Sequence, residues 1–116
     1  MAYSICLKNA KKKYIKYVSK AKLVVNRKII LGADSSSFDN WVSTDIEILN
    51  ITSENDWKDI LTFGKLKAIL MEHVLEHLTE EDAEKGLRNI FKYLKRGGYV
   101  RIAVPDGFHP DFIMVV

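Results

Sequence analysis

The sequence has little of what marks several classes of protein. It contains one cysteine, Cys6, among 116 residues, so no internal disulfide can form and a disulfide-stapled secreted scaffold is excluded. Its apolar runs, such as residues 29–31, 68–71 and 113–116, fall far short of the roughly 20 residues needed to cross a bilayer. These absences predict a cytoplasmic protein without a membrane span.

Acidic side chains are absent from the first 27 residues, which carry seven lysines and one arginine. Tyr14, Ile15 and Val18, with Ile5 further upstream, recur at three- and four-residue spacing, which predicts an amphipathic helix. We interpret residues 1–27 as a basic helical arm whose apolar stripe docks on the rest of the chain. Binding to a nucleic acid or to an anionic membrane is the less favoured alternative for its lysines.

Beyond the arm, the composition is that of one ordinary globular domain, residues 28–116. The whole chain is 47% apolar and 28% charged, with a net charge of +3, which is too balanced to indicate a nucleic-acid binder. Short apolar segments alternate with helical patterns, which is typical of a mostly parallel α/β sheet. The predicted strands are residues 28–31, 41–46, 68–71 and 99–104.

Two helices are expected between these strands. Ser53 is placed to cap a helix over residues 54–61, and Thr79 is placed to cap one over residues 80–95. In the second helix, one face collects the side chains that we expect to lie on the sheet: Ala83, Leu87, Ile90, Phe91 and Leu94. Gly97 and Gly98 should then end this helix.

Residues suited to ligand binding follow three of the predicted strands. Gly32 comes after the first strand and Asp45 ends the second, while Glu72 and His73 come after the third. Because ligands bind open α/β sheets outside the carboxyl ends of the strands, these positions predict a site at one edge. Glycine allows close approach of the backbone to a ligand, and a carboxylate can accept hydrogen bonds from a ribose diol. No metal is expected, since no cysteine or second pair of carboxylates converges there.

Two longer stretches carry a family resemblance. Residues 72–82 read E-H-V-L-E-H-L-T-E-E-D, and residues 87–106 contain L-K-R-G-G and end in V-P-D. This pattern resembles class I S-adenosylmethionine-dependent methyltransferases, over about residues 28–111. The resemblance implies a Rossmann-like three-layer sandwich whose mostly parallel sheet has about five strands and lacks the last two strands of the full family fold.

The resemblance also implies roles for individual residues. Gly32 and Ala33 would face the methionine part of S-adenosylmethionine, and Asp45 the ribose hydroxyls. The remaining cofactor-binding positions would be Ile46, Asn50 and Ile51 near adenine, and Glu72 and His73 near the methyl group. His73, whose unperturbed pKa lies near neutrality, is the candidate general base and the one catalytic residue predicted. The methyl acceptor is not specified by any of these residues.

Departures from the family pattern leave an alternative open. Asp34 stands where the second loop glycine is usual, and Asn50 stands where an acid is common. A non-catalytic interaction protein that has lost tight cofactor binding is therefore the second hypothesis. The strand 99–104 and the apolar tail after it should leave an open sheet edge, so we expect either a homodimer through this edge or the tail, or a truncated family member.

Overall fold

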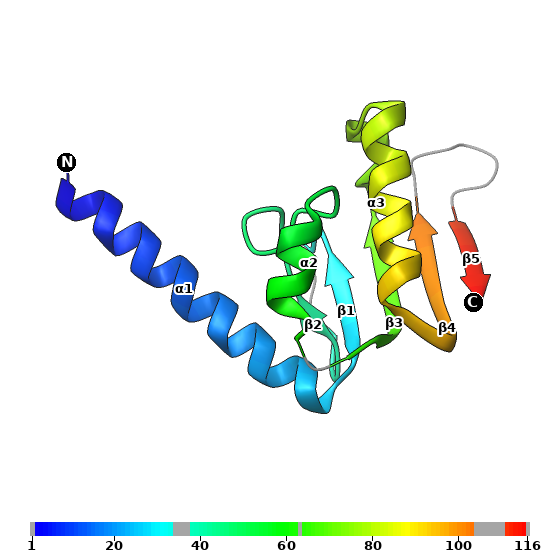
Figure 1. Cartoon of the computed structure of the whole chain (residues 1–116), viewed down its shortest axis with the longest axis horizontal. Helices are drawn as coiled ribbons and strands as arrows, with labels where there is room; N and C mark the ends of the chain where they lie inside the picture. The colour runs from blue at the N-terminus through cyan, green and yellow to red at the C-terminus, as the bar shows by residue number, and fades with distance from the viewer. Residues whose placement is uncertain (1, 34–37, 63, 104–110, 116) are drawn as a thin grey trace.

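The computed structural model describes residues 2–33, 38–62, 64–103 and 111–115. Its sheet has the strand order β2-β1-β3-β4-β5 (Figure 1). Four of its strands are parallel to one another: β1 (Lys28–Leu31), β2 (Val42–Ser43), β3 (Leu66–Glu72) and β4 (Leu94–Ala103). The predicted α/β class with a parallel sheet is confirmed, and the arrangement is compatible with a Rossmann-like fold.

Helices α2 (Glu54–Ile60) and α3 (Glu80–Tyr93) cover the same face of the sheet (Figure 1). α2 lies on the path from β2 to β3 and α3 on the path from β3 to β4, so both crossovers step in the same direction across the sheet. Right-handed crossovers in one direction place their helices on one face. Both predicted N-caps are confirmed, because Ser53 Oγ accepts from Asp56 N at 3.3 Å and Thr79 Oγ1 from Asp82 N at 3.1 Å.

The main core lies between these helices and the sheet. Trp57 of α2 is completely buried, its ring stacks on Tyr93 with the ring centroids 5.3 Å apart, and its Nε1 donates to the Ile51 carbonyl at 2.9 Å. Gly86 lets α3 approach closely, since a Cβ at this position would lie 2.6 Å from Ile51 Cδ1.

The junction of α3 and β4 differs from the prediction in two ways. The helix ends at Tyr93, and Leu94 is already extended, so the prediction that Gly97 and Gly98 end it is wrong. Both glycines lie inside β4, at the point where its pairing with β3 shifts register, and a Cβ at Gly98 would lie 2.9 Å from two backbone carbonyl oxygens. Phe91 is 40% exposed instead of facing the sheet.

The opposite face of the sheet carries a smaller apolar cluster. Ile30, Ala33 and Leu70 are buried there, and Trp41 packs against them. Trp41 precedes β2, which is shorter than the predicted strand 41–46 because residues 46–48 form a turn.

The fifth strand corrects the expectation of an open edge. β5 (Asp111–Val115) pairs antiparallel with β4, with partners from Tyr99↔Val115 to Ala103↔Asp111. The tail of the chain therefore covers the edge that was expected to be free. The expected homodimer depended on an unpaired edge at residues 99–104, and that edge is already paired with β5.

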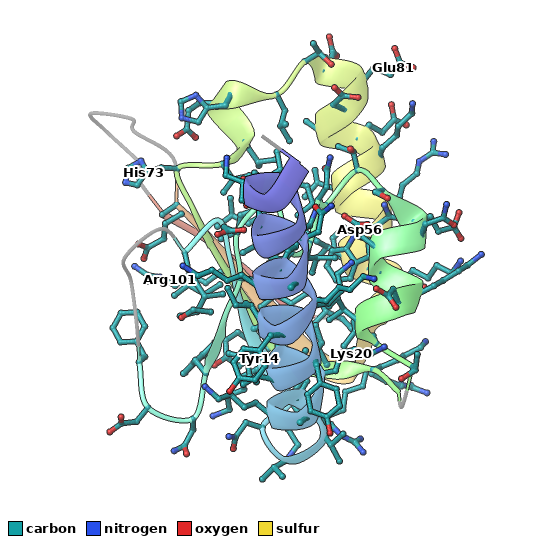
Figure 2. All side chains as sticks on the ribbon, turned by 90° about the vertical axis from the view of Figure 1, so that its left-hand side faces the viewer. Tyr14, Lys20, Asp56, His73, Glu81 and Arg101 are labelled. Carbon is teal, nitrogen blue, oxygen red and sulfur yellow. The ribbon has the colours of Figure 1, made fainter. Side chains whose placement is uncertain are left out.

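Helix α1 (Ala2–Val25) forms as predicted, but its orientation does not follow the prediction. Ser19 and Leu23 are buried against the rest of the chain, whereas Tyr14 is 68% exposed and Ile15 is also exposed. The expectation that Tyr14 and Ile15 dock on the domain is wrong. Figure 2 views the molecule from this side, with α1 in front of the sheet.

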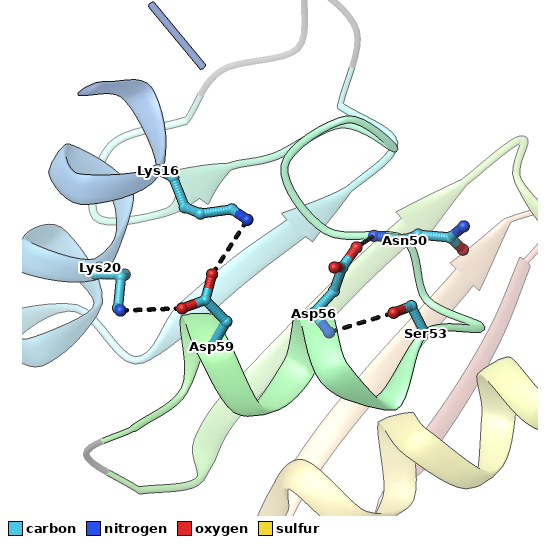
Figure 3. A network of polar contacts seen from close by, with 6 residues as sticks. All are labelled: Lys16, Lys20, Asn50, Ser53, Asp56 and Asp59. Carbon is cyan, nitrogen blue, oxygen red and sulfur yellow. Dashed lines mark hydrogen bonds and ion pairs between the residues drawn. The ribbon is translucent and has the colours of Figure 1, made fainter. Parts of the chain in front are cut away.

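Two lysines of α1 hold the helix to α2. Lys16 Nζ lies 3.1 Å and Lys20 Nζ 3.4 Å from the Asp59 carboxylate (Figure 3). The hydrogen bond from Lys16, aided by Lys20, lowers the pKa of Asp59 below its ordinary value. Among the described residues, no helix is both long and apolar enough to span a bilayer.

Candidate functional site

The carboxyl ends of β1, β2 and β3 meet at one edge of the sheet. β1 lies between the other two and is parallel to both, with Ile29 paired to Val42 and to Ile69. Gly32 directly follows β1, Asp45 lies two residues beyond β2, and Glu72 is the last residue of β3. The structure therefore brings the loops that contain these three residues to the same edge, as parallel strands require.

The loops after β1 and β3 are in direct contact. Gly32 has φ +61°, and a Cβ there would lie 2.5 Å from Val74 Cγ2. α3 follows β3 over one face of the sheet, whereas Trp41, on the connection after β1, packs on the other face. The two connections therefore leave toward opposite faces, which is the topological switch point where open α/β sheets bind ligands.

The backbone of Ala33 takes part in the hydrogen bonding between the segments that follow β1 and β2. Its backbone N–H donates to the Thr44 carbonyl at 2.8 Å, and the Thr44 N–H and hydroxyl both donate to the Ile30 carbonyl at 2.9 Å. These bonds extend the pairing of β1 and β2 beyond the strands. They fix where the loop after β1 begins, but they also occupy the Ala33 N–H. Asp34, the departure from the family loop, lies outside the described residues.

Asp45 is held in a defined orientation. Its Oδ1 accepts from Glu47 N at 2.9 Å and from Ile48 N at 3.3 Å, which closes the turn after β2. Both bonds end on the same oxygen, so within the described chain Oδ2 is left to accept from a ligand hydroxyl. Ile46, the next predicted residue, is 67% exposed beside it.

Asn50 and Ile51 serve the fold. Asn50 Oδ1 accepts from the backbone N–H and the hydroxyl of Thr52 at 3.0 and 2.8 Å, and its own N–H donates to Asp56 Oδ2 (Figure 3). Ile51 is buried beneath α3, and its carbonyl accepts from Trp57 and Asn89. Residues 44–53 contain no strand, so Asn50 and Ile51 lie in the connection between β2 and α2.

Glu72 and His73 lie at the end of β3. Glu72 Oε1 is 3.4 Å from Arg101 Nη1 on β4. His73 has a left-handed backbone with φ +55°, and its N–H donates to the Ala103 carbonyl at 2.8 Å. Its side chain is exposed, with Nδ1 3.7 Å from Glu76 Oε1. His73 is thus a histidine at the switch point whose imidazole is exposed to solvent.

Three residues at this edge were not predicted from the sequence: Val74, Glu76 and Arg101. Glu76 Oε1 lies between His73 Nδ1 and His77 Nε2, at 3.7 and 3.6 Å. Arg101 could have been noticed because it is a charge placed between two apolar residues of a predicted strand. Among the described residues, no group of three or more histidine, cysteine, aspartate or glutamate side chains is arranged to hold a metal ion.

A cleft of about 510 Å³ lies next to Asp45. Its walls include Lys8, Lys11 and Lys12 of α1 on one side and Asp45 and Glu47 on the other. The sequence predicts a basic helical arm, but not that these lysines lie opposite the turn after β2.

Comparisons of the whole chain with protein-family models and with curated proteins found no match.

Proposed function

We propose that this chain is an S-adenosylmethionine-dependent methyltransferase-like protein that binds the cofactor at the carboxyl edge of β1, β2 and β3. The observation that carries the proposal is the switch point between β1 and β3, where the connections after the two strands leave toward opposite faces of the sheet. The E-H-V-L-E-H-L stretch begins at this point, and Asp45 stands at the end of the neighbouring strand. We also propose that the fold is a Rossmann-like three-layer sandwich, with a sheet of about five strands that lacks the last two strands of the family.

The residues at this edge fit the cofactor in part. Asp45 fits, because its turn leaves Oδ2 to accept from a ribose hydroxyl. Ile46 fits as an exposed apolar surface beside it. Ile51 does not fit, because it is buried beneath α3, and the amide oxygen of Asn50 is already bonded to Thr52. Adenine would therefore rest on Ile46 and not on Ile51.

S-adenosylmethionine, when bound, supplies a methyl group on a sulfonium, and its transfer depends mostly on alignment with the accepting atom. The chain's own part would be to orient both molecules and to accept a proton from the acceptor. The exposed imidazole of His73 is the candidate for that proton, and Glu76 beside it would stabilise the charged imidazolium.

The alternative, a non-catalytic interaction protein on this fold, is favoured by one observation. The space above Gly32, which a family member would use for close approach to the cofactor, is filled by Val74. Cofactor binding separates the two hypotheses.

The test is calorimetry of the whole chain with S-adenosylmethionine and with its demethylated product. We expect saturable binding that weakens by about tenfold or more in Asp45→Asn, because an anionic acceptor is lost while Oδ1 can still close the turn. Asp39→Asn is the matched control, since Asp39 precedes β2 and lies at its other end. Binding should persist in His73→Asn, which keeps a residue tolerant of left-handed φ.

Absence of heat at millimolar ligand would reject the cofactor proposal and support the non-catalytic alternative. Equal weakening by Asp45→Asn and Asp39→Asn would show that binding does not involve the edge of the sheet.

A further inference from the structure

The outward side of α1 carries a continuous apolar seam. Its members are spaced four, three, four and three residues apart, and all are exposed: Ala10, Tyr14, Tyr17, Ala21 and Val24. Tyr17 is 72% exposed, whereas Ser19 and Leu23, on the opposite side of the helix, are buried. The seam therefore faces away from the sheet.

This spacing is that of a helix that packs lengthwise on another helix. An apolar residue every 3.5 positions on average keeps one stripe facing a partner along the whole contact. The seam combines two large side chains at its centre, Tyr14 and Tyr17, with small ones on either side, Ala10 and Ala21, and such a mixture suits interdigitation of one helix with another. A nucleic acid would need cations at the centre of the surface, and here the centre is apolar.

Lysines flank the seam. Lys13 precedes Tyr14 and Lys20 precedes Ala21, although Lys20 also pairs with Asp59 of α2, and Lys11, which follows Ala10, lines the cleft beside Asp45. No acidic residue occurs anywhere in α1. Charges at these flanking positions select the partner of a paired helix. The molecule already contains one example of the complementary arrangement, because Asp59 of α2 binds Lys16 and Lys20.

We propose that the seam of α1 is a docking surface for an acidic amphipathic helix of another protein. Apolar residues of the partner would cover Tyr14 and Tyr17, and its glutamates or aspartates would lie beside Lys13. This surface is separate from the edge of the sheet, so the proposal does not depend on the cofactor.

A second copy of the chain fits the surface less well. Pairing of two α1 helices brings lysine-flanked seams together with no acid to neutralise them. Among the other described helices, α2 and α3 turn their buried residues, Trp57 and Ile90 among them, toward the sheet. Neither offers an acidic helix with an exposed apolar seam.

The test uses the whole chain and a fluorescent synthetic peptide of about 28 residues, built of heptads with leucine at the seam positions and glutamate beside them. A second peptide carries lysine in place of glutamate. Anisotropy at about 0.15 M salt, where surface charges are screened beyond about 8 Å, should show at least about tenfold tighter binding of the acidic peptide.

Variants assign the binding to the seam. Tyr17→Ala should weaken it by about tenfold, as loss of a central aromatic anchor does, while circular dichroism shows an unchanged fold. Lys13→Glu should weaken it more than Lys12→Glu, a matched control on the adjacent residue, which lines the cleft on the inner side of α1.

Equal binding of the two peptides, or no effect of Tyr17→Ala, would overturn the proposal. Vesicles of neutral and anionic phospholipid are the competing probe. Vesicle binding by a chain that does not bind the acidic peptide would overturn it in favour of a membrane surface.

Discussion

Helices α1 and α3 both carry an apolar stripe in their sequences, but the two stripes end on opposite sides: one is buried and the other is exposed. Both are amphipathic and rich in charge, but α3 directs Ile90 into the core, whereas α1 directs Tyr14 and Tyr17 into solvent. α3 lies across the sheet, while α1 is attached by its second half, through Ser19 and Leu23. The comparison teaches that an apolar stripe predicts a helix, whereas the elements against which the helix packs decide which of its sides is buried.

The sharpest test of this comparison truncates one aromatic residue in the buried layer, Trp57 of α2, which stacks on Tyr93 of α3, and one on the exposed side of α1, Tyr17. Trp57→Ala should lower the free energy of unfolding by about 3–5 kcal/mol, because it empties the space between α2, α3 and Ile51. Tyr17→Ala should change it by less than about 0.5 kcal/mol, because the ring is exposed. Urea unfolding followed by far-ultraviolet circular dichroism measures both. Similar losses would mean that α1 is packed as firmly as α2 and α3.

A smaller loss of stability is expected at the switch point, where the loop after β1 contacts the loop after β3. Gly32→Ala should cost about 1–3 kcal/mol, since an alanine there has φ +61° and meets Val74. Gly97→Ala is the control for backbone strain alone, because φ is +82° there and no atom lies within 4 Å of the added Cβ.

A second substitution identifies the cause of that cost. In a Val74→Ala background, Gly32→Ala should cost less, because the contact with Cγ2 is gone, and a double-mutant cycle in urea measures the difference. An unchanged cost would assign the whole effect to backbone strain and not to the contact between the two loops.

The smallest effect is expected at the link between α1 and α2. Lys16 and Lys20 lower the pKa of Asp59 in the folded state, so the stabilisation is present above the ordinary aspartate pKa of about 4 and is lost as the pH falls through the lower folded value. Because these side chains are partly exposed, it should amount to at most about 0.5 kcal/mol. Comparison of unfolding of the parent chain and Asp59→Asn from pH 7 downward measures it. A difference that grows on acidification would contradict this sign.

Local features were predictable because their causes lie within a few residues. Ser53 and Thr79 cap their helices through side chains that bond a backbone N–H three residues ahead, and continuous apolar runs mark strands that are covered on both faces. At the candidate site, the order of Gly32, Asp45 and Glu72 along the edge follows from the parallel strands alone.

Other features depend on residues far apart in the chain. The contact of Gly32 with Val74, the antiparallel pairing of β5 with Tyr99 and its neighbours, and the place of Ile51 beneath Gly86 are all set by tertiary packing. Gly97 and Gly98 illustrate the limit well, since a glycine pair after a helical pattern usually indicates a helix end. Here the pair accommodates an irregularity of pairing inside a strand.

α3 passes directly into β4, with no loop between the two elements. Leu94 closes the last turn of α3 through its N–H bond to the Ile90 carbonyl and is also the first residue of β4. One residue added between Tyr99 and Val100, where the pairing with β3 is regular, would exchange the two sides of the following part of β4 and turn Val100 and Ile102 outward, because strand side chains alternate.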